Sequence, residues 1–203
     1  MRSYHPVLSS TFSIIFISII FSCETPEPVK EATPETITRL RLIFTPDAGE
    51  SIVVEAIDPD AEGVQEITAT DSIRLFASTH YELQVQLFNE LVEPAAPEFD
   101  VTVEIEEEGV EHLLLYAWTD GAFDSPSGDG NIDARADEVI YLDADDNGLP
   151  LGLLTGWTTK SGEASLKGNF RIVLKHQPDL KSENSGMNTG ETDLDFTFPL
   201  RIN

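Results

Sequence analysis

The chain has 203 residues, 40% of them hydrophobic, which suits one folded domain with a core and excludes wholesale disorder. It has 37 acidic and 12 basic residues, for a formal net charge of −25. Nucleic acid and anionic headgroups are poor partners for such a surface because binding them needs basic residues, whereas divalent cations and basic surfaces suit it better.

The beginning of the chain is typical of an export signal. Arg2 precedes an apolar stretch over residues 12–21, which is too short to span a bilayer and matches the hydrophobic region of a signal peptide. The stretch runs into Ile20-Phe21-Ser22-Cys23, which is similar to a bacterial lipobox. Cys23 is the only cysteine, and its position favours lipid attachment. We therefore expect a signal peptide over residues 1–22 and lipidation of Cys23.

A tether is expected to follow over residues 23–35. This segment is rich in proline and acidic residues and has no hydrophobic periodicity, which is typical of a semi-extended, solvated linker. The folded domain is expected over residues 36–203.

The first part of this domain predicts strands. Residues 37–45 and 51–57 read as two strands joined by a turn at 46–49. Residues 79–89 alternate strictly between apolar and polar side chains, so that one face is apolar. The acidic segment 100–108 is ambiguous and fits either a strand or a short helical turn.

The middle of the domain combines apolar segments with a long loop. Residues 111–118 and 139–142 are apolar on both faces, as expected of central strands. Between them, residues 119–137 form a loop rich in Gly, Ser and Asp; such a long loop is either functional or an insertion.

Two further alternating segments, 163–177 and 192–202, complete the pattern. The chain therefore predicts an all-β fold, an immunoglobulin-like two-sheet β-sandwich of about seven to nine strands. A barrel is the alternative.

One motif points to calcium. Asp143, Asp145 and Asn147, followed by Gly148, match the first half of a calcium-binding loop, but Leu154 stands where the bidentate Glu belongs. Asn-Gly is also a common hairpin turn, which explains the same residues without a metal.

Two histidines point to a transition metal. His112 shares a strand face with Leu114, and His176 shares one with Leu174, so both are expected on apolar faces. If their strands are neighbours, with Glu111 or Asp179 nearby, the pair could bind zinc. The alternative is two hydrogen-bonded histidines in the core or at a sheet end. No nucleophile elbow or phosphate-binding loop is present in the sequence, so we expect no enzyme.

The chain resembles a family of small Bacteroidota lipoproteins over nearly its whole length after the signal segment. The matching motifs are Cys23, 37–46, 87–90, 106–112, 143–152, 175–178 and 191–199. Members are sometimes labelled periplasmic-binding-type, and some lie alongside TonB-dependent outer-membrane receptors. Many relatives lack the loop 119–137.

The resemblance implies an outer-membrane lipoprotein that faces the periplasm or the cell surface. It implies a non-enzymatic binding or accessory role with a receptor or small ligand, and no catalytic residues. A calcium-stabilised structural or adhesive surface module is the alternative.

Overall fold

The computed structural model describes residue 1 and residues 35–58, 67–133, 139–162 and 165–203. Residues 2–22 of the predicted signal peptide, Cys23 and all of the tether except Glu35 lie outside these residues. The described residues from Glu35 to Asn203 belong to one compact unit.

The larger of two sheets contains seven strands. Its order is β3-β2-β1-β5-β9-β7, and β8 also pairs with β9; all of these pairs are antiparallel. The strands are β1 (Arg39–Pro46), β2 (Ile52–Ile57), β3 (Thr68–Ala69), β5 (His80–Phe88), β7 (Phe123–Ser125), β8 (Ile140–Tyr141) and β9 (Leu154–Thr159).

The smaller sheet contains four strands in the order β4-β11-β10-β6. The long strands β10 and β11 pair antiparallel, as do β10 and β6, whereas the edge strand β4 is parallel to β11. Its strands are β4 (Ile73–Leu75), β6 (His112–Trp118), β10 (Leu166–His176) and β11 (Glu191–Ile202).

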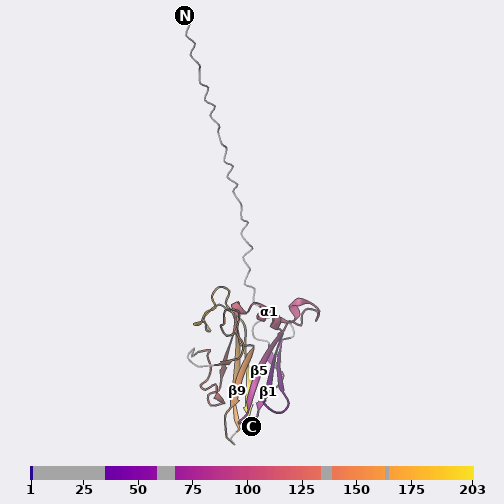
Figure 1. Cartoon of the computed structure of the whole chain (residues 1–203). Helices are drawn as coiled ribbons and strands as arrows, with labels where there is room; N and C mark the ends of the chain where they lie inside the picture. Colours follow the sequence, from indigo (N-terminus) through magenta and orange to yellow (C-terminus); the bar gives the residue numbers. More distant parts are fainter. Residues whose placement is uncertain (2–34, 59–66, 134–138, 163–164) are drawn as a thin grey trace. The chain divides into compact units, whose positions relative to one another are not determined.

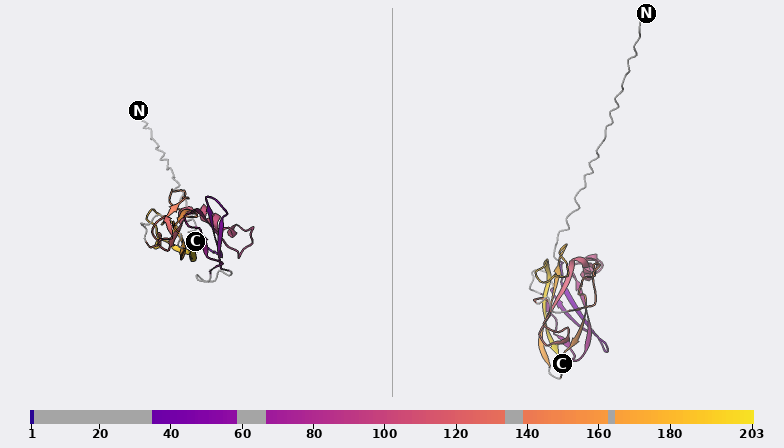
Figure 2. Two further views of the ribbon diagram at one scale, coloured as in Figure 1. Left: turned by 90° about the horizontal axis from the view of Figure 1, so that it is seen from below. Right: turned by 60° about the vertical axis from the view of Figure 1, so that its left-hand side comes forward.

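The core lies between the two sheets, which face each other in Figure 2. Alternating side chains of β1, β5, β10 and β11 point into it, as the period of two in the sequence requires. Its centre is aromatic: the Trp157 ring packs 4.9 Å from that of Phe170 and 5.6 Å from that of Tyr116. These edge-on contacts join β9 to β10 and β6 across the sandwich.

A short helix covers one end of the sandwich. Helix α1 (Val101–Glu107) lies between two 3₁₀ turns, η1 (Pro97–Phe99) and η2 (Gly109–Glu111), at the end opposite the C-terminus (Figure 1). The Asp100 side chain accepts a hydrogen bond from the Thr102 amide and caps the helix. The Thr102 hydroxyl donates to the Leu87 carbonyl and so fixes α1 to β5. In the described part of the chain, no helix is long and apolar enough to cross a membrane.

The predicted all-β, two-sheet architecture is confirmed, and the immunoglobulin-like topology stays a prediction. The described residues contain eleven strands and not seven to nine, because several edge strands have only two or three residues. The segment 100–108 is mainly helical. The sequence analysis missed β9, in which Gly156 and three threonines interrupt the apolar pattern.

The expectation of central strands at 111–118 and 139–142 is wrong. Strand β6 ends the smaller sheet, yet both its faces are buried because Leu113 and Leu115 pack outside the main core with Ile132 and other residues. Strand β8 is a two-residue addition to β9, and Ile140 is 39% exposed.

Residues 129–133, the end of the described part of the loop 119–137, pack against the smaller sheet, whereas residues 123–125 of the same loop form β7 and pair with β9 of the larger sheet. Asn131 is buried; its side-chain oxygen accepts from the Tyr116 amide, and its side-chain nitrogen donates to the Tyr141 hydroxyl. A bridge between Ala117 and Gly130 adds main-chain pairing at the β6 edge. This part of the loop therefore covers an edge that would otherwise be open to other strands.

Replacing Trp157 by Ala should remove the centre of the core. We expect a loss of about 3–5 kcal/mol in the free energy of unfolding, because a fully buried aromatic side chain leaves a cavity. Urea denaturation measures it. Phe76→Ala is the matched control, since Phe76 is 67% exposed, and should change stability by less than about 1 kcal/mol. Equal effects of the two substitutions would contradict the assigned core.

Candidate metal centre

Two histidines face each other at the α1 end of the smaller sheet. His112 begins β6, His176 ends β10, and the two residues are direct cross-strand partners. Their rings stack with centroids 4.7 Å apart and planes 6° from parallel. The side chains are 0% and 5% exposed, so both imidazoles are removed from solvent. The sequence-based prediction that both point to an apolar face is confirmed.

Hydrogen bonds indicate which ring nitrogens carry the protons. His112 Nδ1 lies 3.2 Å from the Glu108 carbonyl oxygen, which can only accept, so Nδ1 donates. His176 Nε2 lies 3.3 Å from the Glu111 carboxylate and donates to it in the same way. In a neutral ring the other nitrogen, His112 Nε2 or His176 Nδ1, keeps its lone pair, and both of these atoms are buried without a hydrogen-bond partner. Metal-binding histidines have this arrangement, in which an acceptor on one nitrogen orients the ring and the other nitrogen binds the ion.

A β-bulge places a carboxylate beside the histidines. Pairing between β10 and β11 shifts after Leu174, so that Leu174 faces Leu194 but Lys175 faces Thr192. Asp193 is therefore the extra residue of the bulge, and a bulge redirects a side chain. The ligand atoms of His112, His176 and Asp193 lie within 4.8 Å of one another. Neither carboxylate oxygen of Asp193 has a hydrogen bond of good geometry.

Four more carboxylates surround this group. Glu35 precedes β1 and has an oxygen 3.8 Å from His112 Nε2. Glu104 and Glu108, one helical turn apart, approach Glu35 to within 4.8 Å, and Glu108 and Glu111 form a similar cluster with His176. We define the metal centre as the set Glu35, Glu104, Glu108, Glu111, His112, His176 and Asp193.

The electrostatics of the centre suit a cation. Burial, together with the negative charges of Glu104, Asp193 and Glu108, raises the pKa of Glu35 to about 7. Burial also raises the pKa of Asp193 to about 6, although His176 and the Glu35 amide oppose the shift. Burial lowers the pKa of His112 to about 4, against the opposing effect of the Glu108 carbonyl, so the ring is neutral at pH 7. Neutral imidazoles and crowded carboxylates are the forms that a divalent cation stabilises.

The donor set suits one class of ion better than another. Two imidazole nitrogens and carboxylate oxygens suit zinc and similar divalent transition metals, whereas calcium prefers six to eight oxygens. The rings are nearly parallel and their lone pairs lie in the ring planes. One ion can therefore bind both nitrogens only if one imidazole rotates about its Cβ–Cγ bond.

The predicted calcium loop has another set of contacts in this structure. The Asp143 carboxylate accepts from the amides of Gly152 and Leu154. Asp145 Oδ1 accepts from the amides of Asn147 and Leu149, and Asp145 Oδ2 lies 2.8 Å from Lys181 Nζ. Calcium binding here stays a prediction, and it would have to compete with these groups.

This loop supports the metal centre. Lys181 Nζ also donates to the carbonyl of Gly109, the first residue of η2, which ends at Glu111 directly before His112. Desolvation raises the pKa of Asp145, but Lys181 and the main-chain amides outweigh it, so this pKa lies below its usual range. Asp145 and Lys181 thus hold the turn from which two residues of the centre project.

The sequence analysis found the two histidines and Glu111 but not the other carboxylates. Asp179, the alternative partner it named, is exposed. Asp193 could be recognised only weakly from the sequence as a site residue, because it directly precedes the apolar stripe that begins at Leu194. Glu35 could not be recognised, because it falls in a proline-rich segment.

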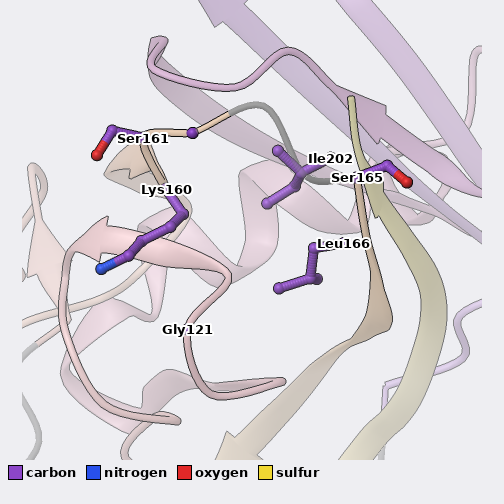
Figure 3. Close-up of a pocket in the computed structure, with 7 residues that line it drawn as sticks. Gly121, Lys160, Ser161, Ser165, Leu166 and Ile202 are labelled. Carbon is purple, nitrogen blue, oxygen red and sulfur yellow. The ribbon is translucent and has the colours of Figure 1, made fainter.

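Apart from the metal centre, the domain has a hollow of about 390 Å³ that borders the ends of β9, β10 and β11 (Figure 3). Leu166 and Ile202 supply an apolar wall, with Lys160 across from them. The Lys160 ammonium is already paired with Asp124 at 2.8 Å. The residues that line this hollow therefore offer fewer polar groups for binding a ligand than the residues of the metal centre do.

No protein-family model matches this chain, and comparison with curated proteins and with solved structures finds no similar protein.

Replacing Lys181 by Met should destabilise the domain by about 3 kcal/mol, because it leaves the Asp145 carboxylate buried without its cation. Chemical denaturation measures the change. Lys160→Met is the matched control: the Lys160–Asp124 pair is exposed, so its loss should cost less than about 1 kcal/mol. A Lys181 variant as stable as the control would contradict the supporting role.

Proposed function

We propose that this chain is a lipid-anchored, non-enzymatic binding protein whose β-sandwich binds a divalent transition-metal ion of the zinc class. The observation behind the proposal is twofold: His112 Nε2 and His176 Nδ1 are buried without a hydrogen-bond partner, and ligand atoms of the two histidines and Asp193 lie within 4.8 Å of one another. Each buried polar atom without a partner costs about 1–3 kcal/mol. A single cation can satisfy both ring nitrogens and the Asp193 carboxylate once one imidazole has rotated about its Cβ–Cγ bond.

The surroundings of the ligands support this function. Glu108 and Glu111 orient the two rings through their other nitrogens, as acceptors around bound metals do. Glu106, Glu107 and Glu108 end α1, where negative charge is unfavourable for the helix dipole, and a cation nearby reduces that cost.

The anchoring part of the proposal depends on the sequence. The apolar stretch 12–21 and Cys23 favour export and lipidation, and in this proposal the acidic segment that follows serves as a spacer between the membrane and the domain. An accessory role beside an outer-membrane receptor fits a domain that holds a metal ion. A pull-down of the lipidated protein from its membrane tests for such a receptor.

Zinc titration of the full chain in detergent, in competition with a chromophoric chelator, tests the binding. We expect saturation at one ion per chain, and a loss of affinity of at least about 10-fold in His112→Asn and in His176→Asn. Circular dichroism checks that both variants remain folded.

His80→Asn is the matched control. His80 is 47% exposed on β5, where it pairs with Asp47, and its loss should leave zinc affinity unchanged. Failure of the wild-type chain to bind zinc, or unchanged affinity in a folded His176 variant, would falsify the proposal.

A further inference from the structure

Glu35 has an unusual position for an acidic residue next to a linker. It is the last residue before the exposed Thr36 and lies four residues ahead of β1, yet its side chain is only 13% exposed. Its carboxylate points back into the sandwich and approaches His112 Nε2 at 3.8 Å. When Glu35 is ionised, this contact is unfavourable, because the carboxylate and the lone pair of His112 Nε2 are both hydrogen-bond acceptors.

The neighbours of Glu35 make its inward position costly without a cation. Ligand oxygens of Glu104 and Glu108 lie within 4.8 Å of its own, and Asp193 raises the electrostatic cost further. Among the described residues, the ion-pair partner of Glu35 is the His112 ring, at 3.8 Å, and no lysine or arginine pairs with it. A shared divalent ion converts both the lone-pair contact and the carboxylate crowding into attraction.

We propose that Glu35 is the fourth ligand of the metal, beside His112, His176 and Asp193, so that the bound ion fastens the end of the tether to the sandwich. This inference rests on the proposed metal-binding function. It assigns the site a closed set of two nitrogen and two oxygen ligands, the composition of a structural zinc site.

The consequence follows from the topology. His112, His176 and Asp193 all belong to the smaller sheet, whereas Glu35 leads into β1 of the larger sheet. An ion held by all four residues cross-links the two sheets at the α1 end. It also holds Glu35, the last residue of the predicted tether, against the sandwich.

The isosteric variant Glu35→Gln tests the inference in the full chain, with zinc as the probe. We expect about 10-fold or greater loss of zinc affinity by chelator competition. Cobalt substitution gives a second readout: four-coordinate absorption bands in the wild type should weaken in the variant. Glu35→Asp, which keeps the carboxylate, should recover part of the affinity.

Hydrogen exchange tests the fastening directly. Zinc should slow amide exchange in peptides that contain residues 35–37 of the wild type, and this protection should be lost in Glu35→Gln. The matched control Glu50→Gln removes an exposed carboxylate from the turn between β1 and β2 and should behave as the wild type. Without metal, Glu35→Gln should unfold at the same temperature as the wild type or higher, whereas loss of a merely structural contact would lower it.

The outcomes separate the two proposals. If the wild type binds zinc and Glu35→Gln binds it equally tightly, or zinc gives no protection at residues 35–37, the role of Glu35 is wrong and the histidine site stands. If the wild type binds no zinc, both proposals are overturned.

Discussion

A buried polar atom needs a partner, and this constraint governs the α1 end of the sandwich. The ring nitrogens of His112 and His176 that remain free and the carboxylate of Asp193 meet there within a few ångströms. A hydrophobic pair of similar volume could fill the same space and would leave no polar atom unsatisfied. That the fold instead places imidazoles and carboxylates here is the physical reason to infer a cation.

The rest of the domain positions this group. Antiparallel pairing sets the two histidines opposite each other, and the bulge in β11 turns Asp193 towards them. Lys175 stabilises the bulge by donating to the Gly190 carbonyl and the Thr192 hydroxyl. At Gly190 the backbone has a φ of +68°, and a Cβ there would lie 2.0 Å from the His176 carbonyl oxygen. Only glycine allows so close an approach.

Alternation along the chain was enough to predict the class of fold and the faces on which His112 and His176 lie. It could not predict that they are partners, because register depends on pairing between segments far apart in sequence. The bulge at Asp193 cannot be recognised from the sequence of β11 alone, because a bulge is defined by the pairing of two strands. The spacing of the acidic loop beginning at Asp143 matches calcium ligands, but it could not show that Lys181 and main-chain amides contact the oxygens of Asp143 and Asp145. Glu35 was assigned to the tether because composition describes a segment and not the direction of one side chain.

X-ray absorption at the zinc edge of the zinc-loaded full chain tests the central claim most directly, because it reports the ligands themselves. The account predicts a four-coordinate ion with two imidazole ligands, identified by their outer-shell scattering, and oxygen ligands at about 2.0–2.1 Å. A six-coordinate, all-oxygen environment without imidazole scattering would contradict it, since the ion would then be bound by surface carboxylates and not by His112 and His176.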